Sequence, residues 1–514
     1  MKKTLRSTVV AVVGLGLVAA ACGSSTKSGS DAATTTAGSA AAATTTAAAA
    51  AGATTTAAAA GGATTTAAAA TGGKKFGKVD DKTYAGAGNF KIDLTKCPND
   101  WNINQGITDS EIKLFLSLPK SGPLAGFGLL ADGSTSYFNY INSQGGIGGR
   151  KIVLDSKDDV YQADKTKANV DEAIASKSYA SLYLTLGTPN NLAIWDTTNK
   201  ECMPQLLNGT GAAQWGDVDA HPWTTGMQLD YTTEAVLWTE WIKKEFPNGA
   251  KVGAVTFNSD FGKSYDKGFK TAIKGSNIEL VADELHEATA PNLTNQFTNI
   301  EAKNPDVILI QTSGAFCTQA MAEIEKRALK AKVMMSGTCG SLSQFFKPLL
   351  DQGLTGKDTY IIQTYKDVND PTWADDAFVK LFHETAKAQG LDDKQSTYAT
   401  GWIFAWFMED ILKNAATYQG GLDRGNIMLA ARNIHESNPL LIKGLTGITD
   451  GTKDAYLTEG GQMVTYTVTD PAQLGTFVPV GDLINLEGQL GTYKTVQEAA
   501  GTATSAPAAA TSTT

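Results

Sequence analysis

The sequence has few of the residue patterns that mark nucleic-acid-binding proteins and metalloproteins. Its 43 Lys and Arg residues against 52 Asp and Glu give a formal net charge of −9, and no basic tract follows the first residues. We therefore expect no nucleic-acid partner. The 4 histidines are scattered and no Cys-x-x-Cys pair is present, so we expect neither a metal nor another cofactor.

Motifs for covalent and phosphate chemistry are also missing. The chain has no G-x-S-x-G elbow, no H-E-x-x-H pair and no Walker-type loop. Asp158 and Asp159 could be imagined as an acid–base pair, but neighbouring residues of a strand point to opposite faces. A surface turn explains the pair better. We predict no catalytic residue, and an extracellular hydrolase is the least favoured alternative.

The first 21 residues have the three parts of a secretory signal peptide. A basic start precedes an apolar run from Val9 to Leu17, and small residues follow up to Ala21. Cys22 comes next, as in a bacterial lipobox, although Ala19 stands where that motif usually has Leu. We predict acylation of Cys22 and an exported protein anchored to the outer face of the cell membrane. Conventional cleavage that leaves Cys22 as a free thiol stays open.

Residues 22–75 are predicted to form the anchor site and a disordered linker. From Ser24 to Gly73 the chain is almost wholly Ala, Thr, Gly and Ser, and these residues bury too little apolar surface to offset the entropy cost of ordering. As a flexible coil this segment would span on the order of 40 Å. O-glycosylation of the threonines stays open. Residues 498–514 have the same composition and are predicted to be a disordered tail.

Four cysteines remain after Cys22. An even number in an exported chain favours two disulfides, and three pairings of Cys97, Cys202, Cys317 and Cys339 are possible. Cys317 and Cys339 are close in sequence and each follows a strand-like run. We therefore favour the pairs Cys317–Cys339 and Cys97–Cys202.

The remaining globular part is about 400 residues long. A chain of this length usually forms more than one hydrophobic core. Short apolar strands alternate with amphipathic helices in two sets, one beginning at the strand Ile112–Leu118 and the other at Val252–Phe257. This alternation predicts an α/β fold with two Rossmann-like lobes, each built on a parallel sheet and joined to the other by hinge strands. Ligands of such sheets bind beyond the carboxyl ends of the strands.

Two segments carry a family resemblance. Ser121-Gly122-Pro123-Leu124-Ala125 follows the first strand, and Gly145-Gly146-Ile147-Gly148-Gly149-Arg150-Lys151-Ile152 precedes the Asp158–Asp159 pair. The chain from about Ile107 to Val468 resembles the branched-chain amino-acid-binding proteins, which are type I periplasmic receptors of ATP-binding-cassette importers.

The resemblance implies a domain order. Residues 76–106 would be an extension that the family usually lacks, and residues 107–228 the first part of lobe 1. Residues 229–360 would form lobe 2, residues 361–440 would return to lobe 1, and residues 441–497 would return to lobe 2 and the hinge.

The same resemblance implies a monomeric receptor that captures a small solute by closing its lobes and delivers it to a membrane permease. A sensor domain that signals to a partner is the alternative. The family match places ligand contacts at Ser121, Phe127, Thr188, Gly209, Thr210, Phe261, Ser313 and Gly314.

Two departures from the family bear on the ligand. Phe127 and Phe261 stand where the family often has tyrosines, and Ser336–Gly340 has no carboxylate where the amino-acid receptors place a glutamate for the ligand ammonium. An ammonium buried without a charged partner is strongly disfavoured. We therefore expect an apolar, aromatic or amide-like solute. The tryptophans Trp195, Trp215 and Trp223 could add stacking surfaces but are at least as well explained as core.

Overall fold

A computed structural model describes the backbone of residues 76–502 and the side chains of residues 76–497. The predicted signal peptide, Cys22 and the linker lie outside the described residues. Between residues 76 and 502, no helix has both the length and the apolar character needed to cross a bilayer.

Lobe 1 is built on a parallel sheet of 5 strands in the order β5-β4-β6-β7-β8. The apolar run of β4 places Leu114, Phe115 and Leu116 in the core, with both faces of the strand covered. The strands are β4 (Glu111–Leu118), β5 (Lys151–Asp158), β6 (Ser181–Tyr183), β7 (Gln205–Asn208) and β8 (Thr224–Gly226).

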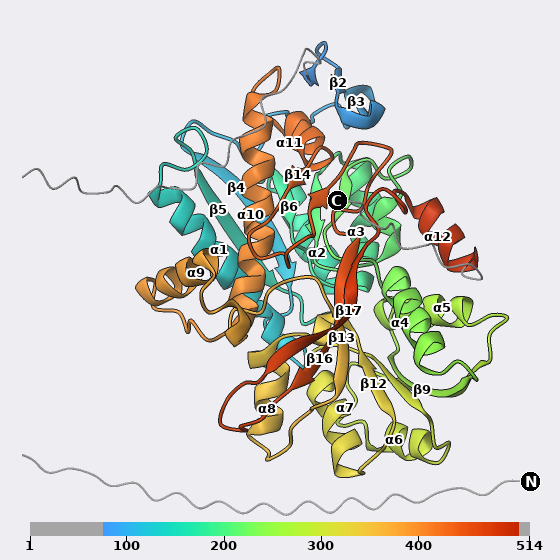
Figure 1. Ribbon diagram of the computed structural model, residues 1–514. Coiled ribbons are helices and arrows are strands. Elements are labelled where there is room, and N and C mark those ends of the chain that lie inside the picture. Colours follow the sequence, from blue (N-terminus) through green and yellow to red (C-terminus); the bar gives the residue numbers. More distant parts are fainter. Residues whose placement is uncertain (1–75, 503–514) are drawn as a thin grey trace, which may run out of the picture. The chain divides into compact units, whose positions relative to one another are not determined.

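Helices cover both faces of this sheet. One face carries α1 (Leu129–Ser143), α9 (Ala377–Ala388), α10 (Ser396–Thr417) and α11 (Arg424–Ala431), and the other carries α2 (Ala163–Ala175) and α3 (Thr188–Lys200) (Figure 1). The aromatic stretch of α10, with Trp402 and Phe407 fully buried, packs along α1. That stretch therefore belongs to the core of lobe 1.

Lobe 2 has a mixed sheet of 7 strands in the order β10-β9-β11-β12-β13-β16-β17. The prediction of a parallel sheet is correct for β9 to β13, whereas β16 and β17 run antiparallel at one edge. The strands are β9 (Ala250–Phe257), β10 (Ile278–His286), β11 (Val307–Gln311), β12 (Lys332–Met335), β13 (Thr359–Gln363), β16 (Gly460–Thr467) and β17 (Thr476–Asn485).

The helices of lobe 2 divide between the two faces of its sheet. Helices α4 (Tyr231–Glu245) and α5 (Asp260–Ala272) pack on one face, and α6 (Thr294–Glu301), α7 (Ala315–Lys326) and α8 (Lys347–Leu350) pack on the other. Both lobes are therefore doubly wound, in agreement with the predicted fold class.

The chain passes between the lobes three times: between β8 and α4, after β13, and into β16. The last return comes later than the predicted residue 441. Leu441, Leu445 and Leu457 belong to the core of lobe 1, and the hairpin of β14 (His435–Glu436) and β15 (Gly447–Ile448) lies in the same segment. Lobe 2 therefore resumes only at Gly460. Helix α12 (Tyr493–Thr502) extends past the predicted start of the tail at residue 498.

Residues 76–106 form an antiparallel sheet of β1 (Gly77–Lys78), β2 (Thr83–Ala85) and β3 (Lys91–Asp93) that joins the core of lobe 1. The buried Arg424 donates to the carbonyls of Ala180, Cys202 and Asn102, and its guanidinium lies 4.8 Å from the Trp101 ring. The extension is thus clamped to the lobe by a buried cation that donates to carbonyl oxygens and contacts an aromatic ring.

Both predicted disulfides are present. Cys97–Cys202 links the extension to the segment before β7, and Cys317–Cys339 links the first turn of α7 to the loop after β12. The second bond therefore joins the start of α7, which follows β11, to the loop after β12.

Candidate ligand-binding cleft

A cleft of about 1330 Å³, part of it open to solvent, lies between the lobes. It is bordered by the loops that follow the carboxyl ends of strands in both sheets, as Rossmann-like topology predicts. Most of its wall is apolar or aromatic, and the wall includes Leu124, Phe127, Tyr161, Leu229, Tyr231, Phe261, Phe345 and Phe404.

The lobes touch beside this cleft, so the structure represents a closed arrangement. The N–H of Ala315 in lobe 2 donates to the carbonyl of Pro123 in lobe 1 over 3.3 Å. The hydroxyl of Thr397 donates to Gln344 Oε1 over 2.7 Å, and the Phe127 and Phe345 rings lie 6.2 Å apart. Hydrogen bonds and ring contacts therefore join the two lobes in addition to the chain segments that connect them.

The lobe 1 wall contains Thr188 and Gly209, two of the residues proposed as ligand contacts. Thr188 is the first residue of α3 and follows Gly187, whose φ of +100° is accessible to glycine at little cost. The Thr188 and Thr210 hydroxyl oxygens lie 2.6 Å apart, and both residues are buried. Thr210 is therefore behind the wall, where it holds Thr188.

Other predicted residues divide between the cleft and its surroundings. Phe127, Phe261 and Ser313 line it. Ser121 is exposed outside the wall and donates its hydroxyl to Asp158 over 2.6 Å. Gly314 precedes α7 and packs against Leu124 instead of facing the cavity. The structure thus does not place Ser121, Thr210 or Gly314 on the wall, because each is engaged by neighbouring protein atoms.

Two tyrosines line the cleft from elements that the sequence did not single out. Tyr161 comes from the turn after β5, and Tyr231 comes from the first turn of α4, where its ring contacts Phe261 at 4.9 Å. The loss of tyrosines at positions 127 and 261 is thus partly compensated. Trp215 and Trp223 are buried outside the cleft wall, and Trp195 is also absent from it.

A buried carboxyl group also faces the cleft. Glu234 projects from α4, and its Oε1 accepts the N–H of Gly337 over 2.7 Å while Oε2 accepts the Tyr265 hydroxyl over 2.6 Å. Gly337 belongs to the loop in which the sequence lacks a carboxylate. A carboxyl therefore reaches this loop from a helix more than 100 residues earlier, although both of its oxygens already accept hydrogen bonds from the protein.

The environment of Glu234 favours its neutral form. Burial raises the pKa of this carboxyl to about 8, although the Tyr265 hydroxyl and the Gly337 N–H partly offset the effect. At neutral pH the group is mostly protonated, so it offers little charge to a ligand ammonium.

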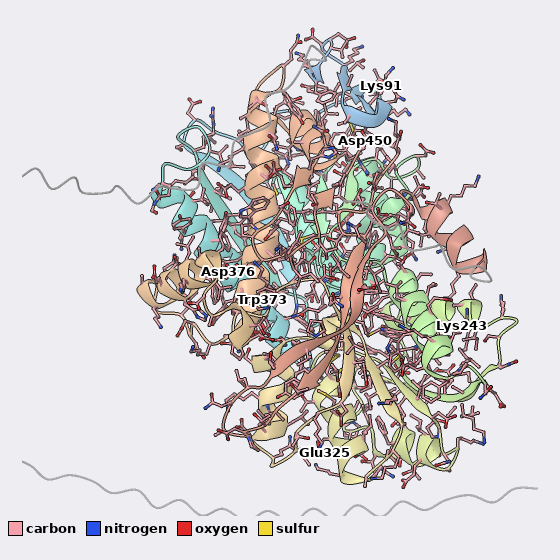
Figure 2. All side chains as sticks on the ribbon, in the orientation of Figure 1. Lys91, Lys243, Glu325, Trp373, Asp376 and Asp450 are labelled. Carbon is pink, nitrogen blue, oxygen red and sulfur yellow. A yellow bond between two sulfur atoms is a disulfide. The ribbon has the colours of Figure 1, made fainter. Side chains whose placement is uncertain are left out.

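Two further charged residues border the cleft, Lys366 and Asp367. The Lys366 ammonium lies 2.7 Å from a carboxylate oxygen of Asp376 and 5.2 Å from the Trp373 ring centroid; Asp376 and Trp373 are labelled in Figure 2. Asp367 accepts the N–H of Leu342 and the hydroxyl of Ser396, each over 2.8 Å. Each charged side chain on the described wall thus has partners within the protein.

Glu234→Gln tests the neutral carboxyl. A carboxyl whose pKa rises from 4.5 to about 8 on folding stabilises the protein below pH 4.5, and this contribution is lost as the pH rises toward 8. We expect the free energy of unfolding of E234Q to match the wild type near pH 5. Above that pH the free energy of unfolding of E234Q should be larger than that of the wild type. The difference should grow by up to about 1.4 kcal/mol per pH unit until pH 8.

Urea unfolding at several pH values measures this difference. Glu245→Gln, an exposed position on the same helix, is the matched control and should show no pH-dependent difference. Parallel curves for E234Q and wild type between pH 5 and pH 8 would show that the Glu234 carboxyl is ionised in the folded protein.

Comparison with known proteins places the cleft in context. A solved fatty acid ABC transporter substrate-binding protein from Thermomonospora curvata is 19% identical over 76% of this chain and 96% of its own, with a TM-score of 0.63. A branched-chain amino acid ABC transporter protein from Thermus thermophilus with bound valine is 16% identical over 76% of this chain and 100% of its own, with a TM-score of 0.66. These similarities show a shared fold.

A possible leucine/isoleucine/valine-binding protein from Rhodopirellula baltica is 13% identical over 74% of this chain and 98% of its own, with a TM-score of 0.59. No curated protein matches the sequence. The sequence model described as periplasmic binding protein matches residues 111–466, which is most of the chain. The chain therefore belongs to the periplasmic binding protein family, and its fold is that of the type I periplasmic binding proteins.

Proposed function

We propose that this protein is the lipid-anchored substrate-binding component of an ATP-binding-cassette importer, and that it captures a small uncharged solute with a large apolar or aromatic part. The observation that carries the proposal is the closed cleft, whose wall is mostly apolar and whose charged side chains are already paired or hydrogen-bonded within the protein. The protein would act as a monomer, by hinge closure and without chemistry.

An α-amino acid fits this cleft poorly. Its ammonium would meet Glu234, which is mostly neutral at pH 7 and already accepts two hydrogen bonds. Its carboxylate would compete for the Lys366 ammonium with Asp376 and the carbonyl of Pro439, to which that ammonium already donates. Burying either charge without a partner costs several kcal/mol, on the order of the whole binding energy of a weak ligand.

An uncharged polar group meets fewer obstacles. Thr188 lies on the wall and is held by Thr210, so it can present a fixed hydroxyl to a ligand. Burying the apolar remainder of the solute against rings such as Phe127 and Phe261 would supply about 25 cal/mol per Å² of surface removed from water. One similar structure is described as a fatty acid ABC transporter substrate-binding protein, and another contains bound valine. Binding of a fatty acid or of valine is therefore a competing outcome for this chain.

A thermal-shift panel tests the ligand class, with the chain made soluble by Cys22→Ser. We expect phenylacetamide or another neutral aromatic amide to raise Tm more than valine or hexadecanoate does. A solute present at 100 times its Kd would raise the free energy of unfolding by about 2.7 kcal/mol. Thr188→Ala should weaken binding of the best solute by about 1–3 kcal/mol, because a buried polar group of the solute would lose its partner.

Thr198→Ala is the matched control, since this buried hydroxyl belongs to the same helix and hydrogen-bonds within the lobe. It should leave affinity unchanged. Strong and selective stabilisation by valine would contradict the proposed ligand class. Failure of every solute in the panel to stabilise the protein would count against the receptor function itself.

The anchor is tested separately by Cys22→Ala in the full precursor. Acylation of Cys22 would place the wild-type protein in the detergent phase of a Triton X-114 partition, and the variant, which has no thiol to acylate, should move to the aqueous phase. Ser24→Ala, in the adjacent polar stretch, is the matched control and should partition as the wild type does. An aqueous wild-type protein would contradict lipid anchoring while leaving solute capture intact.

A further inference from the structure

The Asp158–Asp159 pair shapes the turn that follows β5. Asp158 Oδ1 accepts the N–H of Lys120 over 2.7 Å and the N–H of Val160 over 2.9 Å. Asp159 is fully buried, and its Oδ1 accepts the N–H of Tyr161 over 2.9 Å. Asp158 lies at the surface, whereas Asp159 follows the end of β5 and is buried, so the predicted surface turn is wrong for Asp159.

The other oxygen of Asp159 fixes the turn to the lobe. Oδ2 accepts the hydroxyls of Ser117 and Thr166, each over 2.9 Å. Thr166 accepts in turn from the Asn190 amide over 2.7 Å, which connects the turn to α3. Asp159 is therefore the centre of a buried network that joins β4, α2, α3 and the turn.

The backbone of this turn is strained. Val160 has φ of 53° and Tyr161 has φ of 60°, which places two consecutive non-glycine residues in the left-handed region. This left-handed backbone conformation is a clear outlier for a β-branched residue such as Val160, and it persists only where surrounding contacts enforce it. The N–H groups of both residues are held by the two aspartates, so the pair enforces this conformation.

This turn places Tyr161 between the two lobes. Its ring covers Gly187, where an added Cβ would lie 2.6 Å from Tyr161 Cε2. In lobe 2 the ring stacks on Phe257, with 5.9 Å between centroids and 23° between planes. The side chain lines the cleft, and its hydroxyl has no hydrogen-bond partner among residues 76–497.

We propose that Tyr161 is a specificity-determining residue of the cleft, whose ring contacts the solute across the lobe interface and whose hydroxyl donates a hydrogen bond to the solute's neutral polar group. Asp159 is the positioning residue that holds Tyr161 there. This inference rests on the proposed capture of an uncharged solute and adds the group that recognises its polar part. A side chain with only a packing role would not need a hydroxyl on the wall of the cleft.

Tyr161→Phe and Tyr161→Ala test the proposal in the full chain carrying Cys22→Ser. The probes are phenylacetamide, which has an amide acceptor, and ethylbenzene, which has none, with Kd measured by calorimetry or thermal shift. Y161F should raise the Kd of phenylacetamide by about fivefold or more and leave that of ethylbenzene unchanged. Y161A should weaken both, because the ring is lost as well.

Asp159→Ala should weaken phenylacetamide binding as Y161A does, since the turn would relax and withdraw the ring. Tyr179→Phe is the matched control, because Tyr179 is a lobe 1 tyrosine outside the cleft whose hydroxyl donates to Asp155. It should bind both probes like the wild type. Y161F remains decisive if Y161A or D159A does not fold, because it removes one oxygen only.

The outcomes separate this inference from the function on which it rests. If the wild type binds phenylacetamide and Y161F binds it equally well, the role of the hydroxyl is wrong. An equal loss of affinity for both probes in Y161F would assign Tyr161 a packing role only and also overturn the proposal. If the wild type binds neither probe, the proposed solute class fails first, and the inference fails with it.

Discussion

The structure depends on one constraint: when the two lobes meet, each polar group that they enclose needs a partner. The charged residues of the cleft wall each have such a partner. Glu234 accepts two hydrogen bonds, Asp367 accepts from backbone and hydroxyl groups, and Lys366 is paired with Asp376. The wall therefore presents mainly apolar surface and a few oriented hydroxyl groups, which suits a solute without net charge.

The same constraint explains how the lobes are linked. The contacts between Ala315 and Pro123 and between Gln344 and Thr397 form at the edges of the cleft, where each lobe supplies partners for the other. Such contacts are lost when the lobes separate, so their free energy belongs to the closed state alone. Under the proposed function, a solute that fills the cleft would add to that free energy, so that occupancy would be converted into a change of shape.

Much of the fold could be predicted from the sequence because the strands are short apolar runs between amphipathic helices. The predicted strands Ile112–Leu118 and Val252–Phe257 lie within β4 and β9. Strand β6, in contrast, ends at Tyr183, next to Leu184, whose positive φ of 55° no composition pattern reveals. The predicted Thr188, Gly209 and Phe261 line the cleft. Glu234 was missed because its partner Gly337 is more than 100 residues away, and Tyr161 because its position depends on a strained turn.

The central claim is that the closed arrangement is linked to solute occupancy. Its most direct test is the distance between spin labels at the exposed positions Asp351 in lobe 2 and Glu384 in lobe 1, measured by double electron–electron resonance in protein carrying Cys22→Ser. We expect one short-distance population with saturating solute and a shift toward longer distances without solute. Identical distance distributions in both conditions would contradict it.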